Sequence, residues 1–239
     1  MRRIICKHVN NLRDLGGYMT QDNRITKFNS IYRSDVPIFL TERELNYFQK
    51  NKLTTIIDLR TKEEISKKAN YFQDKGFDYY NITLKGENCP KREKDIPFGY
   101  MEIINDKDNI KLVFEVIKNS QGAIFINCNS GKDRTGVICM LLLLLAKVPE
   151  KDIIADYQVS YTYLMDNIKK IHEENPNLPK FLGSSKAEYM EKTLELFKDK
   201  YKTIENYMKF IGLTDEDIEI IINKITEKKS KNTWIIKNR

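Results

Sequence analysis

The sequence has few of the residues that build metal centres and disulfide scaffolds. It contains four cysteines and two histidines in 239 residues and no CxxC pair. Structural zinc sites need four closely spaced ligands, and small disulfide frameworks need a denser set of cysteines, so both classes are excluded. We therefore expect reduced thiols in a reducing compartment, with no metal and no organic cofactor. The six residues are Cys6, Cys89, Cys128, Cys139, His8 and His172.

Long hydrophobic runs are also missing. The longest, at 137–146, has ten residues, about half of what a transmembrane helix needs. Only three apolar residues separate Arg3 from Lys7, too few for the hydrophobic segment of a signal peptide. We expect a soluble, cytoplasmic protein without an integral membrane segment. Export that needs no cleavable signal stays open.

The charge of the chain is positive, but nothing in it resembles a nucleic-acid-binding motif. The formal net charge is +7, and 31 of the 41 basic residues are lysines. The only tryptophan is Trp234, and no alternation of aromatic and basic residues marks a stacking surface. The charge is compatible with anionic substrates, and we expect no nucleic-acid partner.

The most informative segment is NCNSGKDRTG at 127–136. It places Cys128 and Arg134 six positions apart around a glycine-containing loop. An apolar, strand-like run precedes the loop and a helical apolar run follows it, so the loop opens a helix. Free N–H groups and the positive end of the dipole at a helix start bind anions, and a thiol placed there ionises readily. This arrangement predicts a cysteine nucleophile beneath a bound phosphoryl group.

Two other readings of this loop compete with the first. A cysteine in a strand-to-helix turn can be simply buried, but burial does not explain the adjacent Lys-Asp-Arg cluster. A nucleotide-binding P-loop needs glycine five residues before Gly131 and a hydroxyl after Lys132, where this chain has Ile126 and Asp133. The nucleotide reading is excluded.

The loop resembles the active-site signature of cysteine-dependent protein tyrosine phosphatases, His-Cys-x5-Arg-Ser/Thr. Its GKDRTG ending is similar to the bacterial, tyrosine-phosphatase-like branch of dual- and triple-specificity enzymes. Further matches in order and spacing are NLRDLGGY at 11–18, YRS at 32–34, IDLRT at 57–61 and DYxxS at 156–160. The resemblance covers about residues 8–225. One departure is Asn127, which stands where the family usually has histidine; it implies either a harmless exchange or a slower enzyme.

The resemblance implies roles for the loop residues. Cys128 would be the nucleophile, and Arg134 with the backbone N–H groups of residues 129–134 would hold the phosphate oxygens. Thr135 would donate a hydrogen bond to the cysteine sulfur. The expected phosphate-binding residues are Asn129, Ser130, Gly131, Lys132, Asp133 and Arg134.

A carboxylic acid must protonate the leaving oxygen, and the chain has no Trp-Pro-Asp loop to supply it. Asp133 is the first candidate because the resembling branch is thought to use this position; its alternative role is an ion pair with Lys132 or a helix cap. Asp58 is the second candidate, with a structural pair to Arg60 as its alternative. Asp95, in a polar loop, is the third.

The sequence is compatible with more than one class of substrate. Lysine inside the loop is frequent in phosphoinositide phosphatases, so Lys132 either meets a second phosphate or is a surface residue. We expect a protein-tyrosine phosphatase of broad specificity that acts on phosphorylated protein, with a phosphoinositide phosphatase as the alternative. A non-catalytic phosphate-binding module is the alternative from another class. A rhodanese-like sulfur carrier is disfavoured because it has no need for Gly-x-x-Arg-Thr-Gly. Oligomeric state cannot be inferred.

Alternating strand and helix patterns predict an α/β fold with a mostly parallel central sheet flanked by helices, as in protein tyrosine phosphatases. The Asp22-Asn23 turn is expected to join 24–28 to 17–20 as a hairpin. The loop then lies at the carboxyl end of its strand, where α/β proteins bind ligands. Expected strands are 54–59, 78–84 and 123–128, and expected helices are 41–49, one from 61, 101–119 and 134–147.

After residue 177 we expect helices only. Helices are predicted over 185–201, with a Ser185 capping box, over 203–212 and from 214. They either cover the site as a lid, with a hinge at 176–185, or simply pack on the core. We expect one phosphatase domain over 1–239, divided into an α/β core (1–177), a helical extension (178–229) and a basic tail (230–239).

Overall fold

A central five-stranded sheet organises the molecule. The computed structural model describes residues 2–85 and 90–229; Cys89 and the expected tail with Trp234 lie outside them. The strand order is β1-β3-β6-β4-β5, all parallel except β1. This confirms the predicted α/β class with a mostly parallel sheet. The strands are β1 (Arg13–Asp14), β3 (Ile31–Ser34), β6 (Ala123–Asn127), β4 (Leu53–Asp58) and β5 (Asp78–Asn81).

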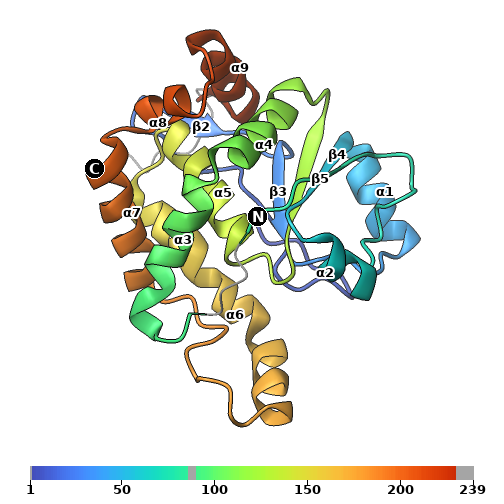
Figure 1. Cartoon of the computed structure of the whole chain (residues 1–239). Coiled ribbons are helices and arrows are strands. Elements are labelled where there is room, and N and C mark those ends of the chain that lie inside the picture. Colours follow the sequence, from blue (N-terminus) through green and yellow to red (C-terminus); the bar gives the residue numbers. More distant parts are fainter. Residues whose placement is uncertain (1, 86–89, 230–239) are drawn as a thin grey trace, which may run out of the picture.

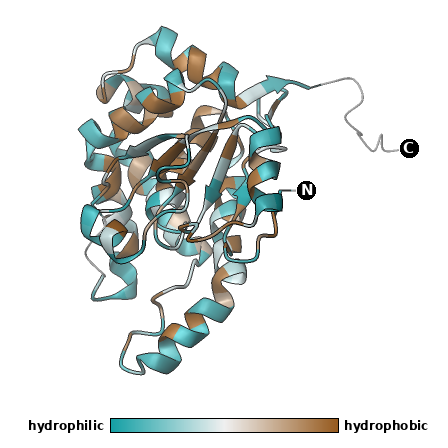
Figure 2. Cartoon of the chain, turned by 90° about the vertical axis from the view of Figure 1, so that its right-hand side faces the viewer, coloured by the Kyte–Doolittle hydropathy of each residue, from teal (hydrophilic) through white to brown (hydrophobic). Residues whose placement is uncertain are grey.

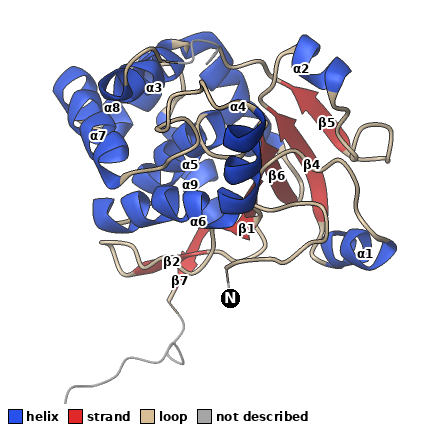
Figure 3. Ribbon diagram, turned by 90° about the horizontal axis from the view of Figure 1, so that it is seen from below, coloured by secondary structure: helices blue, strands red, loops and turns tan. Residues whose placement is uncertain are grey.

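The two faces of the sheet carry unequal layers (Figures 1 and 3). One face is covered by the larger set of helices, which share an extended apolar cluster with the sheet. The other face is covered by α1 (Glu42–Lys50) and a compact aromatic cluster around Phe48, Phe72 and Phe125. The larger layer contains α3 (Ile96–Asn105), α4 (Lys107–Asn119), α5 (Arg134–Leu145), α6 (Glu150–Glu174), α7 (Ala187–Tyr201), α8 (Ile204–Phe210) and α9 (Asp215–Ile225).

Figure 2 shows why the middle strands form a sheet core: hydrophobic colour concentrates on them and on the inner sides of the helices. All five residues of β6 are buried, and α5, which follows it, is buried along nearly its whole length. A parallel strand that is covered on both faces has a continuous run of apolar residues, as in the AIFI segment at 123–126. The predicted strand at 123–128 and helix at 134–147 are thereby confirmed to within two residues at their ends.

Capping boxes located several helices correctly. Thr41, Thr61 and Thr214 each accept the N3 backbone N–H, and the N3 carboxylate binds back, at the starts of α1, α2 (Lys62–Lys67) and α9. Thr203 caps α8 as expected. The prediction for Ser185 is wrong: Lys186 is the N-cap of α7, and Ser185 Oγ instead accepts Tyr161 N–H and donates to the Gln158 carbonyl on α6.

Two further predictions need correction. The single helix expected over 101–119 is two helices, α3 and α4, which meet at Asp106 (φ −76°, ψ 65°). Asp106 accepts both of its carboxylate hydrogen bonds from Asn109 Nδ2, a local bond that competes with helix continuation. Strands also do not stop at residue 177. After α9, β7 (Thr226–Lys228) pairs antiparallel with β2 (Arg24–Thr26), and its polar sequence carries no strand pattern.

The expected hairpin at 17–28 is present in reduced form. The Thr26 N–H donates to the Tyr18 carbonyl and the Thr20 N–H to the Arg24 carbonyl, and Asn23 adopts the left-handed conformation (φ 62°) that its turn needs. Strand β3 was not predicted, because Arg33 interrupts its four residues. In the described part of the chain, no helix is both long and apolar enough to cross a membrane.

Candidate active site

The loop between β6 and α5 lies at the carboxyl end of the sheet, between the ends of β3 and β4. Gly131 makes its tight turn possible. Its φ of 66° favours glycine, and a Cβ atom there would lie 2.2 Å from the Ser34 carbonyl. The Val36 N–H donates to the Asn129 carbonyl and fixes the loop to the chain after β3. The close approach of β3 therefore holds the loop in its curved shape.

The curved loop leaves its own N–H groups free. Among the described residues, no hydrogen bond uses the backbone N–H of any residue from Asn129 to Arg134. Free backbone donors at a helix start, with the positive end of the helix dipole behind them, are suited to binding an anion. The sequence predicted these groups as phosphate ligands, and the structure leaves all of them available.

A cavity of about 220 Å³ opens over the loop. Cys128 lies at its base and is only 1% exposed. The loop contributes Ser130, Lys132, Asp133 and Arg134 to the walls, and α3 and residues 181–183 complete them. Asn129, Gly131 and Thr135 do not line the cavity. Thr135 is fully buried, and its hydroxyl has no hydrogen-bond partner in the part of the chain that the structure describes.

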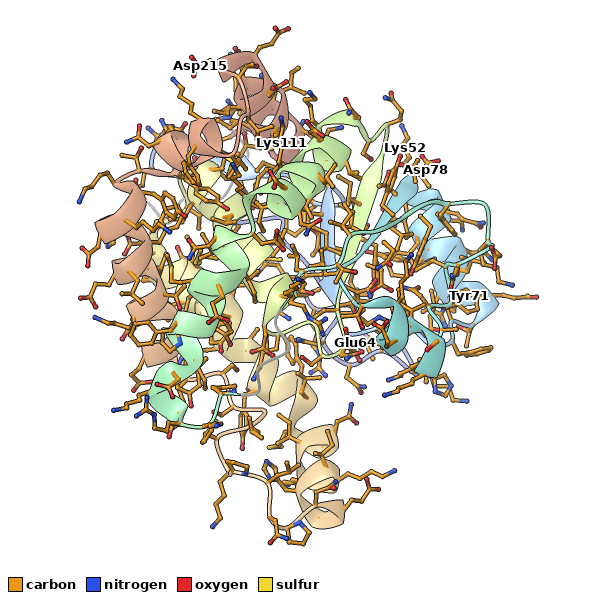
Figure 4. All side chains as sticks on the ribbon, viewed as in Figure 1. Lys52, Glu64, Tyr71, Asp78, Lys111 and Asp215 are labelled. Atoms are coloured by element: carbon orange, nitrogen blue, oxygen red, sulfur yellow. The ribbon has the colours of Figure 1, made fainter. Side chains whose placement is uncertain are left out.

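Arg134 is held in position by Glu64, the N3 residue of α2, whose side chain also caps that helix. Arg134 Nη1 and Nη2 donate to the two carboxylate oxygens of Glu64 at 2.6 and 2.7 Å. Burial alone would raise the pKa of Glu64, but the bonds from Arg134 and from the Thr61 N–H together with the nearby arginine charges lower it. Figure 4 labels Glu64 on α2, beside the end of the sheet. Arg134 Nη1 also donates to the Leu59 carbonyl at 3.5 Å, so these bonds use three of the five guanidinium donors and leave two for an anion.

Asp133 also has partners that the sequence did not reveal. Tyr100, on α3, donates its hydroxyl to Asp133 Oδ1 at 2.5 Å and contacts the Tyr157 hydroxyl at 2.6 Å. Burial raises the pKa of Tyr100, and the Asp133 carboxylate raises it further, so Tyr100 remains a donor. Asp133 is the N-cap residue of α5 without making a side-chain cap, and its side chain is 41% exposed.

Lys132 is not a surface lysine. It is 7% exposed and lines the cavity. Its Nζ donates to the Ser184 carbonyl at 2.9 Å and lies 3.4 Å from Asp133 Oδ1. Lys132 thereby connects the loop to the segment after α6. Residues 181–183 of that segment line the cavity together with α3, whereas α7 packs on α3 and α6.

The two other candidate acids lie outside the cavity. Asp58 is fully buried and accepts hydrogen bonds from Arg60, Asn70 and Tyr79. Although burial works in the opposite direction, these bonds lower the pKa of Asp58, which disfavours a proton donor. Asp95 forms an exposed pair with Arg92 at 2.8 Å, and that bond lowers its pKa as well. The geometry favours Asp133 among the three.

A buried ion network supports the loop from below. Arg33 donates to the Gly131 carbonyl at 2.7 Å and to Asp156 Oδ2 at 2.5 Å. Arg13 binds the other Asp156 oxygen at 2.9 Å and the Ser160 hydroxyl at 3.0 Å. The segments 11–18, 32–34 and 156–160, which carried part of the resemblance, are thus joined in one structural cluster.

Asn127 is tied into a second buried network. Its Oδ1 accepts from Asn70 Nδ2 at 3.0 Å, and Asn70 also binds Asp58. Its Nδ2 has no partner among the described residues. The amide therefore anchors the end of β6 through one of its two polar atoms.

The profile of the tyrosine phosphatase family matches residues 4–227. The chain belongs to this family. A tyrosine-protein phosphatase of Nostoc commune is 30% identical over 189 residues, covering 68% of this chain and 63% of that protein. A relative from Cupriavidus necator, also named for tyrosine-protein phosphatase, is 26% identical over 162 residues, covering 62% and 59%. The match thus spans less than two thirds of the length of either relative.

Two solved structures are also similar. One is a cysteine-to-serine variant of TpbA of P. aeruginosa in complex with pTyr: 10% identity, TM-score 0.36, coverage of 60% of this chain and 77% of that one. The other is the core catalytic domain of the PP-IP phosphatase SIW14 of S. cerevisiae: 21% identity, TM-score 0.35, coverage of 69% and 94%.

Proposed function

We propose that this member of the tyrosine phosphatase family hydrolyses phosphate monoesters, phosphotyrosine in proteins among them, through a cysteinyl-phosphate intermediate. The observation that carries the proposal is the loop itself: Cys128 lines a cavity, and the six backbone N–H groups that follow it in the chain are free of hydrogen bonds among the described residues. This arrangement matches the charge of a transferring phosphoryl group, whose three equatorial oxygens need donors while sulfur approaches in line.

The first step forms the covalent intermediate. Cys128 Sγ, as thiolate, attacks phosphorus, and the bond from phosphorus to the ester oxygen breaks. Asp133, protonated at this stage, gives its proton to the leaving oxygen, which departs as an alcohol or phenol. Arg134 and the loop N–H groups hold the phosphoryl oxygens throughout, while Glu64 fixes the plane of the guanidinium.

The second step regenerates the thiolate. A water molecule attacks the cysteinyl phosphate, Asp133 takes up a proton from that water, and the S–P bond breaks to release inorganic phosphate. The buried Thr135 hydroxyl, which has no other partner among the described residues, supports a role as donor to the departing sulfur. Tyr100 orients the Asp133 carboxylate for both proton transfers.

Hydrolysis of p-nitrophenyl phosphate, with EDTA and a reductant present, tests the proposal. Wild-type protein should turn over the ester without metal, and Cys128→Ser should lose the activity while retaining the thermal stability of the wild type. Activity that survives in the variant would place the reaction elsewhere. A folded wild-type protein without turnover would favour a phosphate-binding module.

A phosphoinositide substrate is the second candidate, favoured by the buried position of Lys132 in the cavity wall. Its ammonium group could meet a second phosphate on the same ligand. Lys132→Ala should then lower kcat/KM for a phosphatidylinositol bisphosphate more than for a phosphotyrosine peptide. An equal loss on both substrates would remove this candidate.

A further inference from the structure

A second positively charged hollow lies at the opposite end of the sheet. A groove of about 730 Å³ is lined by residues that precede β3, β4 and β6 and by α9. Lys27, Lys50, Lys52 and Lys224 line it, and no Asp or Glu among the described residues does. We call this hollow the basic groove. Five residues of β6, rising about 3.3 Å each, separate it from Cys128, a distance of about 16 Å or more. Figure 4 shows Lys52 and Glu64 at opposite ends of the sheet.

The four ammonium groups of the basic groove have no carboxylate partner in the described part of the chain. None of them takes part in an ion pair within the described ranges 2–85 and 90–229. Lys27 Nζ donates to the Asn223 carbonyl at 2.6 Å, and Lys224 Nζ donates to the Ser120 carbonyl. A nearby carboxylate, Asp14, accepts the Asn29 N–H but is itself buried under the groove residues. Neutral carbonyls thus orient Lys27 and Lys224 without neutralising their charges.

Two of these charges, Lys27 and Lys224, lie close enough to repel each other. Burial lowers the pKa of Lys224, and the adjacent Lys27 ammonium lowers it further. Like charges held close without a counter-ion oppose folding, and an anion that binds between them relieves that repulsion. The charge arrangement thus favours a bound anion over an empty groove.

We propose that the basic groove is a second binding site, separate from the Cys128 cavity, for a ligand that carries two or more phosphate groups. Four lysines around one hollow can contact several phosphates at once, more than a single phosphate could use. Phe28 and Ile220, which are 46% and 41% exposed, line the same groove and provide apolar contact for the rest of the ligand. The proposal does not depend on the chemistry at Cys128.

Binding of inositol hexakisphosphate tests the proposal directly. The titration uses the full chain with Cys128→Ser, which prevents turnover, and follows backbone amide NMR signals near Ala123 and Asn223. The double variant Lys50→Glu with Lys52→Glu should weaken binding at these signals at least about tenfold, the equivalent of one lost charged hydrogen bond. Both residues are exposed, so the variant should fold.

The matched control is Lys151→Glu with Lys169→Glu, two exposed lysines of α6 that line no part of the groove. It changes the net charge by the same amount and should leave binding at the groove within about twofold of the parent chain. Equal losses in both double variants would mean that net charge alone attracts the ligand, which overturns the proposal. No shifts at the groove signals in the Cys128→Ser chain would overturn it too, provided that vesicles also fail to bind.

Vesicles distinguish the two sources of such phosphates. Sedimentation with phosphatidylcholine vesicles, with and without phosphatidylinositol 4,5-bisphosphate, reports binding to a lipid headgroup. Groove-dependent binding to these vesicles assigns a lipid source, and binding of the soluble hexakisphosphate alone assigns a free ligand.

In a chain that keeps Cys128, the groove variant should hydrolyse p-nitrophenyl phosphate within about twofold of wild type, since the groove is remote from the loop. Loss of binding at the groove can thus be told apart from loss of the proposed phosphatase activity.

Discussion

At the scale of single residues, Asp156 balances two buried charges. It is the only carboxylate that forms ion pairs with both Arg13 and Arg33 in the described structure. All three side chains are nearly inaccessible to solvent. Asp156→Asn should lower the free energy of unfolding by about 3–5 kcal/mol, since two buried guanidinium groups lose their counter-charge. Urea denaturation measures this loss. Glu174→Gln, which removes an exposed pair with Lys170, should change stability little.

The same residue predicts a pH dependence. Burial would raise the pKa of Asp156, but the two arginines outweigh burial and hold it well below its usual value. A lowered pKa in the folded state contributes stability that is present above the unfolded value, about 3.9, and is lost as pH falls below it. The stability difference between wild type and Asp156→Asn should therefore shrink as pH drops below about 4. A difference independent of pH from 7 to 3 would contradict this assignment.

Kinetics can test the proposed role of Asp133 as the general acid. Asp133→Asn should lower kcat strongly for an alkyl or phenyl phosphate, whose poor leaving group needs a proton, and much less for p-nitrophenyl phosphate. The comparison of kcat across leaving groups measures the effect. Asp95→Asn should leave all of these rates unchanged because Asp95 is outside the cavity. An equal loss on good and poor leaving groups would show that Asp133 acts only on the shape of the loop.

At the scale of elements, the residue that caps the start of helix α2 also contacts the site. Glu64 completes the capping box with Thr61 and also binds Arg134. Glu64→Gln should lower kcat/KM about tenfold, since it removes one charged partner that orients the guanidinium. Steady-state kinetics on p-nitrophenyl phosphate measure the change. Glu63→Gln, its exposed neighbour on the same helix, is the control. Unchanged kinetics in Glu64→Gln would mean that Arg134 needs no external support.

The elements also show what sequence patterns could and could not predict. Local signals located the Cys128 loop, β6, α5 and the capped helices, because strand burial, helix periodicity and threonine caps act within a few residues. The missed strand β7 depends on pairing with β2, about 200 positions away in the chain. Its three polar residues gain order only from that partner. Long-range pairing of this kind leaves no local pattern.

The candidate site shows the same division. The loop residues followed from their spacing, but Glu64, Tyr100 and Arg33 reach the loop from α2, α3 and β3. The spacing of Thr61 and Glu64 indicates a capping box and hence a helix start, but it does not indicate that Glu64 also binds Arg134. Arg33 lies in a segment that matches the family, but the sequence does not indicate that it binds the Gly131 carbonyl. Sequence spacing therefore predicted the reacting groups, and only the fold revealed what holds them.

At the scale of the whole molecule, we propose that residues 178–229 belong to the same cooperative unit as the α/β core. Helices α7, α8 and α9 share one apolar cluster with β6 and α5, including Met190, Tyr207 and Ile221. Denaturation should therefore give a single transition by both fluorescence and circular dichroism. A chain ending at residue 185 should fail to fold, because it exposes that cluster. Two separate transitions would show that the helical extension is independent.

The central claim is that Cys128 forms a covalent bond to phosphorus, and trapping that intermediate tests it most directly. Wild-type protein mixed with a phosphotyrosine peptide and quenched in acid within milliseconds should carry one phosphoryl group, and peptide mass spectrometry should place it on Cys128. Cys128→Ser should show no such adduct under the same conditions. Turnover by wild-type protein without any Cys128 adduct, even when quenched at the earliest times, would contradict the proposed mechanism.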